Sequence, residues 1–139
     1  MNVYKHRLMN IQEMSTLSQY RLPVKIFILN NQYMGMVRQW QELLHGNRLS
    51  ESYMDSLPDF VKLAESFGAT GLRVKKPSEV DFLIKEMMNI KGSVICDVVV
   101  DPKENCFPMI PSGSTHDQML LGPNDKVEGE ISEEGMVLV

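Results

Sequence analysis

The chain has 139 residues, of which 43% are hydrophobic and 23% charged, and these proportions are typical of one soluble globular domain. Its net charge of −4 gives no electrostatic reason to expect binding to nucleic acid or to an anionic membrane. No apolar run approaches the roughly 20 residues of a transmembrane helix, and no signal-peptide segment follows the basic residues near the start. These features predict a cytoplasmic protein.

The two cysteines and three histidines do not form a metal-binding motif. Cys96 and Cys106 lie ten positions apart without CxxC spacing, and the histidines (His6, His45 and His116) are scattered. We therefore expect neither a zinc site nor a disulfide framework. The 11 methionines are interpreted mainly as core filler, because a flexible thioether fits irregular gaps.

Hydrophobic periodicity predicts three elements in the first third of the chain. Residues 9–20 place apolar side chains three apart, as on one face of a helix. Residues 24–29 are apolar except for Lys25, which indicates a strand buried on both faces of a parallel sheet. Residues 34–44 are expected to form a second helix. Its apolar stripe comprises Met36, Val37, Trp40 and Leu44.

The middle of the chain continues the alternation of helices and strands. The pattern predicts a helix over 59–67, a strand over 72–74, a helix over 80–91 and a strand over 93–100 interrupted by Asp97. Ser78 and Asp81 suggest a capping box at the start of the helix over 80–91. Such alternation predicts an α/β fold with a mostly parallel sheet and helices on both faces.

Asn30 and Asn31 stand where the first strand ends and a helix is about to begin. Ligands of open parallel sheets bind beyond the carboxyl ends of the strands, and a helix N-terminus suits a phosphate. An asparagine oxygen could also coordinate Mg²⁺. The pair can also be explained as a turn or a helix N-cap. From the pair alone, this explanation is favoured over a ligand-binding site.

The residues around this pair carry a family resemblance. The stretch 22–41, and within it Gly35-Met-Val-Arg-Gln-Trp40, resembles the thiamine-diphosphate-binding domain of the acetolactate synthase (acetohydroxyacid synthase) catalytic subunit. Five further stretches fit the same family: Met9–Glu13, Glu51–Met54, Asp59–Ala64, Phe67–Ala69 and Pro108–Gly113. The likeness extends from residue 9 to about 123. We accordingly expect residues 9–107 to form this domain and residues 108–139 to form a tail with an acidic, flexible end.

The resemblance implies a role for several residues. Asn31 would bind Mg²⁺ through its side-chain oxygen and Tyr33 through its backbone carbonyl, so that the metal holds the diphosphate beside Gly35 and Met36. Met36, Val37, Trp40 and Ser112 would line the substrate channel. The alternative for Trp40 is a core anchor at helical spacing, with Arg38 at the surface. No catalytic residue is expected in this chain, since the family's cofactor-activating Glu belongs to a different domain.

The resemblance also implies a reaction. The family condenses two pyruvates, or pyruvate and 2-ketobutyrate, in the biosynthesis of valine, leucine and isoleucine, and the position of Trp40 would favour 2-ketobutyrate as acceptor. Its members are homodimers or tetramers with a regulatory small subunit and carry FAD on a domain not matched here. Another thiamine-diphosphate carboligase, such as glyoxylate carboligase or pyruvate oxidase, is an alternative within the enzyme class.

Residues 1–8 depart from the family pattern. Tyr4 stands where the family has an Mg²⁺-binding Asp, and Lys5 follows it. A truncated or misassembled gene start is the simplest hypothesis, and we expect the chain alone to be inactive and to self-associate. Two further alternatives are a degenerate, non-catalytic paralogue that acts as an interaction module and a generic α/β domain without retained function.

Overall fold

The structure is a computed structural model that describes residues 10–125. Contacts divide these residues into two compact units, each described separately below. The sheet unit consists of residues 10–32 and 55–102, and the helix-and-loop unit of residues 33–54 and 103–125. None of the described helices is long and apolar enough to cross a membrane. The predicted domain boundaries at residues 9, 107 and 108 are not tested by this division and stay predictions.

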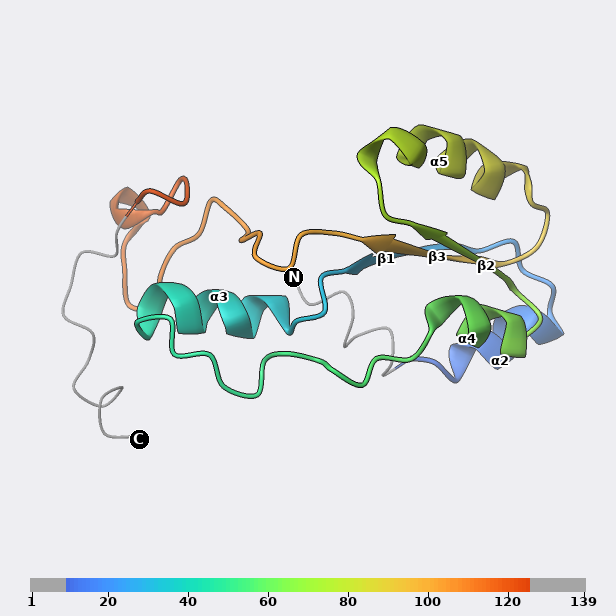
Figure 1. Ribbon diagram of the computed structural model, residues 1–139, viewed down its shortest axis with the longest axis horizontal. Coiled ribbons are helices and arrows are strands. Elements are labelled where there is room, and N and C mark those ends of the chain that lie inside the picture. The colour runs from blue at the N-terminus through green and yellow to red at the C-terminus, as the bar shows by residue number, and fades with distance from the viewer. Residues whose placement is uncertain (1–9, 126–139) are drawn as a thin grey trace. The chain divides into compact units, whose positions relative to one another are not determined.

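Three parallel strands form the sheet unit's centre (Figure 1). Strand β3 (Val94–Val99) lies between β1 (Lys25–Asn30) and β2 (Thr70–Val74). Lys25 is in register with Val94 on one side of β3, and Thr70 is in register with the same residue on the other. The carboxyl ends of all three strands therefore lie along one edge of the sheet.

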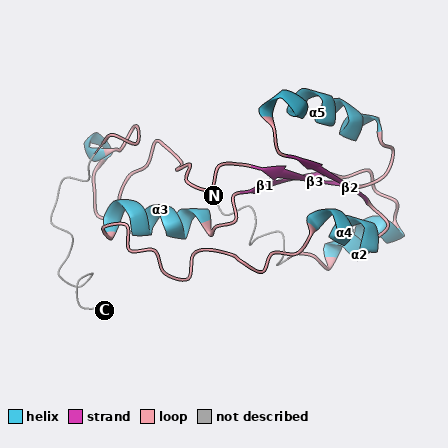
Figure 2. Ribbon diagram, viewed as in Figure 1, coloured by secondary structure: helices cyan, strands magenta, loops and turns pink. Residues whose placement is uncertain are grey.

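Helices cover both faces of this sheet, as Figure 2 shows. Helix α5 (Val80–Asn89) packs on one face, and α2 (Glu13–Gln19) and α4 (Phe60–Ser66) lie on the other. The observed order of helices and strands is the predicted one, and the α/β fold class is confirmed. Asp59, at the predicted start of α4, accepts hydrogen bonds from the backbone N–H groups of Val61 and Lys62 and caps the helix.

Two local predictions were wrong. The Ser78–Asp81 capping box does not form, because Pro77–Glu79 is a 3₁₀ turn (η1) that leads directly into α5 without a side-chain cap. Strand β1 is not buried on both faces. Its side chains alternate, and Phe27 and Leu29 are 41% and 50% exposed, because the core beneath α5 is formed with β2 and β3 and contains no β1 residue.

The core beneath α5 consists of side chains from three elements. The buried members are Val74, Leu83, Met87, Val94 and Cys96. On the opposite face, Ile28 and Ile95 are fully buried in the sheet and Phe60 is fully buried in α4. Met87 and Met14 have the core role predicted for most methionines, whereas Met88 is 65% exposed.

Gly71 allows α4 to approach β2 closely. A Cβ at this position would lie 2.6 Å from both the Cα and the carbonyl oxygen of Val61. We expect Gly71→Ala to lower the free energy of unfolding by about 1–3 kcal/mol, because helix backbone cannot yield as a flexible side chain can. Urea unfolding measures the change. Gly92→Ala is the matched control, since a Cβ there meets nothing within 4 Å, and an equal loss in both variants would contradict the prediction.

The helix-and-loop unit contains α3 (Gly35–Leu44), the short 3₁₀ turn η2 (His116–Gln118) and connecting loops. Two isolated β-bridges link its segments, one between Tyr33 and Tyr53 and one between Met109 and Leu120. The segment after residue 108, predicted to be a tail, thus has local structure as far as residue 125. The acidic end beyond that point, like residues 1–8, lies outside the described residues.

Candidate cofactor-binding site

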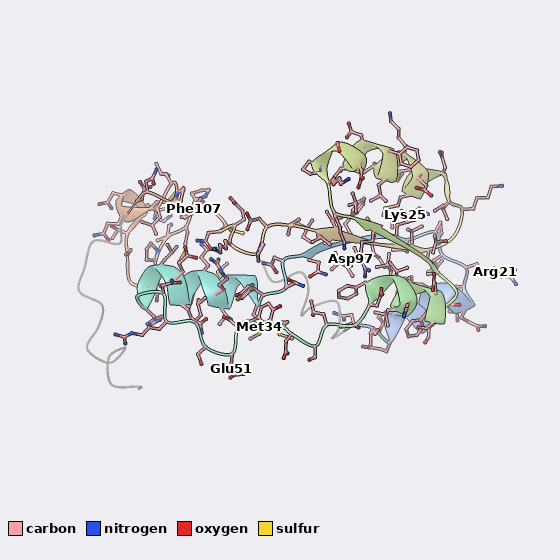
Figure 3. The ribbon with its side chains drawn as sticks, viewed as in Figure 1. Arg21, Lys25, Met34, Glu51, Asp97 and Phe107 are labelled. Atoms are coloured by element: carbon pink, nitrogen blue, oxygen red, sulfur yellow. The ribbon has the colours of Figure 1, made fainter. Side chains whose placement is uncertain are left out.

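A buried polar side chain marks the centre of the sheet's carboxyl edge. Asp97, on β3, is 1% exposed and lies among the strands (Figure 3). Both of its carboxylate oxygens are bound. Oδ1 accepts a hydrogen bond of 3.0 Å from Asn30 Nδ2, and Oδ2 accepts one of 2.8 Å from Arg73 Nε. The buried carboxylate of Asp97, which interrupts an apolar strand in the sequence, therefore has a hydrogen-bond donor at each oxygen.

Arg73 joins Asp97 to a second carboxylate, Asp59, through an Nη2–Oδ1 contact of 2.8 Å. The hydrogen bond to Asp97 is the largest influence on the Arg73 guanidinium and raises its pKa. For Asp59, burial raises the pKa, but the N–H groups of Lys62 and Val61 together with Arg73 outweigh it and hold the pKa below its usual range. The three side chains form a charged, hydrogen-bonded series that links β3 and β2 to the start of α4.

Asn30 connects this series to the turn that follows β1. Its Oδ1 accepts a hydrogen bond of 3.2 Å from the backbone N–H of Gln32, and its backbone carbonyl accepts one from the N–H of Val100. Gln32 has a φ of 58°, a left-handed conformation that costs energy for a residue with a side chain. The turn interpretation of the asparagine pair is therefore correct for Asn30. Asn31, half-buried, is the residue enclosed by this turn.

The helix-and-loop unit presents the start of α3. Met34 is the N-cap residue of α3 and provides no side-chain cap. Its backbone N–H donates a hydrogen bond of 2.8 Å to the carbonyl oxygen of Ser52 (Figure 3). The Tyr33 and Tyr53 rings meet edge to face at a centroid distance of 5.1 Å, and the Arg38 guanidinium lies 5.6 Å from the centre of the Tyr33 ring. The N-terminus of a helix carries a positive partial charge, which suits an anionic group. Gly35 and Met36, the predicted diphosphate neighbours, are its first two residues.

The buried residues of α3 are polar. Arg38 binds Glu42 at 2.7 Å, the Lys103 carbonyl and Asn105. Gln39 donates to the Cys106 carbonyl and accepts from the Cys106 N–H. These contacts attach residues 103–106 to the helix.

The apolar stripe of α3 faces outward, contrary to the usual pattern for such a stripe. Met36, Val37 and Trp40 are 36%, 40% and 45% exposed, whereas Arg38 is 6% exposed. The core-anchor alternative for Trp40, which required Arg38 at the surface, is therefore wrong. Ser112 lies in an exposed turn whose Gly113 has a positive φ. Whether these four residues line a substrate channel is not tested by the structure.

Comparison with known proteins decides the family. The model of the thiamine pyrophosphate enzyme C-terminal TPP-binding domain matches residues 7–98. The chain belongs to this family. The acetolactate synthase large subunit of Haemophilus influenzae is 46% identical over 114 residues, covering 81% of this chain and 20% of the relative. The large subunit of acetolactate synthase isozyme 3 of Escherichia coli is 44% identical, and the match covers 85% of this chain and 21% of that relative. The acetolactate synthase large subunit of Cyanidium caldarium is also 44% identical, and the match covers 81% of this chain and 19% of that relative.

A solved structure confirms the fold of this TPP-binding domain. The thiamine diphosphate-dependent 4-hydroxybenzoylformate decarboxylase of Rhodococcus jostii matches with a TM-score of 0.63 and 24% identity. The match covers 70% of this chain and 18% of that one. The TPP-binding domain described here thus spans about one-fifth of the length of the acetolactate synthases that it matches.

Residues 10–125 contain no cluster of three or more His, Cys, Asp or Glu side chains that could hold an ion. Tyr4, which the family resemblance aligns with a metal-binding Asp, and the neighbouring Lys5 lie outside the described residues. The predicted ligands Asn31 and Tyr33, two positions apart in the sequence, belong to different units of the structure.

The hydrogen bonds that connect Asp97 with Arg73 and Asn30 were not predicted from the sequence. The available signal was a lone carboxylate within an apolar strand, which has to find a partner when it is buried. The identity of the partners depended on strand register, which pairs Arg73 with Asp97 across β2 and β3.

The two cysteines are expected to differ sharply in reactivity. Burial, and secondarily the charge of Asp97, raises the pKa of the Cys96 thiol to about 11, whereas Cys106 is exposed. At pH 8 roughly one Cys96 in 1,000 would be a thiolate, and that fraction is also shielded from reagent. Alkylation at pH 8 followed by mass spectrometry should modify Cys106 alone, with Cys96 reacting after unfolding in urea. Comparable labelling of both cysteines in the folded chain would contradict the assignment.

Proposed function

We propose that this TPP-binding domain serves an acetolactate synthase catalytic subunit, which condenses two pyruvates, or pyruvate and 2-ketobutyrate. The observation that carries the proposal is the 44–46% identity to acetolactate synthase large subunits over more than four-fifths of the chain. The 4-hydroxybenzoylformate decarboxylase, at 24% identity, supports only the fold. The 139 residues alone are proposed to be inactive.

Thiamine diphosphate, when bound, supplies a nucleophilic carbanion and an electron sink. We propose that Asn31 binds the Mg²⁺ that accompanies the diphosphate, through its side-chain oxygen, and that Tyr33 contributes its carbonyl. Neutral oxygens are suitable ligands for this hard cation, and the diphosphate supplies further oxygens. The N-terminus of α3, at Gly35 and Met36, carries the positive partial charge of the helix dipole, which supports a role in holding the anionic group.

The exposed stripe of α3 supports the proposed substrate contacts. Met36, Val37 and Trp40 present apolar and aromatic surface instead of entering a core, as residues facing a small 2-keto acid would. Trp40 is proposed to favour the larger acceptor by contact with its additional methylene, an effect worth about 1–3 kcal/mol. Ser112 is proposed as a fourth contact. Three further proposals come from the family resemblance alone: FAD, a homodimer or tetramer, and a regulatory small subunit. A cytoplasmic location is proposed from the composition of the chain.

A chimera tests the proposal directly. Residues 9–125 would replace the matching segment of the Haemophilus influenzae large subunit, so that the remaining four-fifths of the enzyme is supplied by a relative. The chimera is expected to convert pyruvate to acetolactate with thiamine diphosphate and Mg²⁺. A folded chimera that binds the cofactor but decarboxylates pyruvate without forming acetolactate would favour a different thiamine-diphosphate enzyme.

A second candidate is a non-catalytic interaction module, and the observation that favours it is Tyr4 in place of a metal-binding carboxylate. Such a module would associate with intact synthase subunits. Co-expression of the tagged 139-residue chain with an acetolactate synthase large subunit tests this. Stoichiometric co-purification would support the module, and independent elution of the two proteins would count against it.

A further inference from the structure

We propose that Asp97 is a positioning residue, which orients the turn carrying Asn31 through the side-chain amide of Asn30. The inference rests on the proposed role of Asn31 as an Mg²⁺ ligand. All of these residues, with Gln32, lie in the sheet unit.

The first step is the orientation of the Asn30 amide. An ionised carboxylate only accepts hydrogen bonds, whereas an amide has one accepting and one donating end. Because Asp97 Oδ1 receives a hydrogen bond of 3.0 Å from Asn30 Nδ2, the amide oxygen of Asn30 must point the other way. Asn30 is 8% exposed, so little water is present to satisfy a flipped amide.

The second step leads from Asn30 to the turn. The outward-pointing Oδ1 accepts the N–H of Gln32 at 3.2 Å, and Gln32 adopts its left-handed φ of 58°. A flipped Asn30 would present its NH₂ group to that N–H, and two donors would face each other. The orientation of the Asn30 amide therefore stabilises the strained backbone on the far side of Asn31.

The third step explains why Asp97 itself stays fixed. Its second oxygen accepts Arg73 Nε at 2.8 Å, and Arg73 is also paired with Asp59 at 2.8 Å. The carboxylate is thus bound at both oxygens, and it occupies the central strand at the register position beside Ile28 of β1. The negative charge of Asp97, its burial and its register position beside β1 together leave the amide of Asn30 one favourable orientation.

The variant Asp97→Asn keeps the size of the side chain, removes the negative charge paired with Arg73 and replaces one accepting oxygen by a donor. The new amide at position 97 would have one accepting atom for two donors, and the charged Arg73 donor forms the stronger hydrogen bond. The NH₂ group of that new amide would then face Asn30, whose own amide flips and withdraws the acceptor from Gln32. The double variant Asn30→Asp with Asp97→Asn restores the matching of donors and acceptors but not the ion pair with Arg73, because the new carboxylate at position 30 accepts from both the Gln32 N–H and the amide at position 97.

Two measurements on the full chain test the inference. The first is amide hydrogen exchange of Gln32 by NMR, with the N–H of Val94, bonded to the Val24 carbonyl at the opposite end of the sheet, as internal reference. Exchange at Gln32 relative to Val94 is expected to rise about tenfold in Asp97→Asn and to return in the double variant. Asp81→Asn, which removes an exposed carboxylate in the first turn of α5 outside this hydrogen-bonded series, is the matched control and should change it little.

The second measurement links the turn to metal binding. Mn²⁺ with thiamine diphosphate is the probe, because a paramagnetic ion broadens nearby signals even when binding is weak. The probe is applied to Tyr4→Asp with Lys5→Gly, the variant expected to bind the cofactor. In this background the side-chain amide signals of Asn31 should broaden, broaden less when Asp97→Asn is added, and broaden fully again when Asn30→Asp is added as well. Loss in the single variant and recovery in the double variant would support positioning.

The remaining outcomes overturn the inference in distinguishable ways. Unchanged relative exchange at Gln32 in a folded Asp97→Asn chain would show that Asp97 does not orient the turn. If Gln32 responds as expected but Mn²⁺ leaves Asn31 unaffected in every variant, the proposed metal role of Asn31 fails and the inference fails with it. If Asp97→Asn does not fold, the double variant decides, and rapid exchange at Gln32 in that folded chain would overturn the inference.

Discussion

Supplied with pyruvate, thiamine diphosphate and Mg²⁺, the 139-residue chain alone is expected to form no acetolactate above a protein-free control. The chain corresponds to about one-fifth of the length of the synthases that it matches. By the family resemblance, the Glu that activates the cofactor belongs to a different domain, and no described residue of this chain is assigned that role. Binding contacts alone lower no chemical barrier unless they are stronger in the transition state.

The assay has a clear control and a clear contradiction. An intact acetolactate synthase measured at the same molar concentration establishes that substrate, cofactor and detection are adequate. Time-dependent acetolactate formation by the purified chain, increasing in proportion to its concentration, would contradict the prediction and would place complete catalytic machinery within these residues.

In the chimera with the Haemophilus influenzae subunit, Asn31→Ala is expected to lower kcat/KM for pyruvate at least about 100-fold at a fixed Mg²⁺ concentration. Replacing groups that only support a metal ligand already costs about 10–100-fold, so loss of the ligand itself should cost no less. Part of the loss should be recovered at high Mg²⁺, because weakened metal binding is compensated by mass action.

Asn89→Ala provides the matched control for this substitution. Asn89 is an exposed residue at the end of α5, so the same chemical change there leaves the carboxyl edge of the sheet unaltered. Its kcat/KM should stay within about twofold of the parent chimera. Equal activity of the Asn31→Ala and Asn89→Ala chimeras would remove Asn31 from the proposed metal site.

The sequence was sufficient to predict the order of elements, because long-range burial leaves a periodic pattern in each segment. Residues 24–29 and 93–100 were recognisable as strands, and β1 and β3 largely coincide with them. Asp59 was correctly placed at the start of α4, since an N-cap is a local interaction. The missing capping box at Ser78 shows the limit of this approach, because Pro77 favours a 3₁₀ turn before α5.

The features that the sequence did not reveal depend on contacts between distant segments. Leu29 is apolar but half exposed because the core beneath α5 is formed with the other two strands. Arg38 is charged but buried because the distant residues Lys103 and Asn105 accept its hydrogen bonds. The partners of Asp97 likewise follow from the strand order β1-β3-β2, which no local pattern specifies.

Titration calorimetry of thiamine diphosphate into the chain, with and without Mg²⁺, tests most directly the proposal that its metal site is incomplete. The unaltered chain should show weak or no Mg²⁺-dependent binding, because the family resemblance aligns Tyr4 with a metal-binding carboxylate and a lysine beside that position would repel the cation. The variant Tyr4→Asp with Lys5→Gly should bind at least about tenfold more tightly, and only with Mg²⁺ present. Micromolar, Mg²⁺-dependent binding by the unaltered chain would contradict this account.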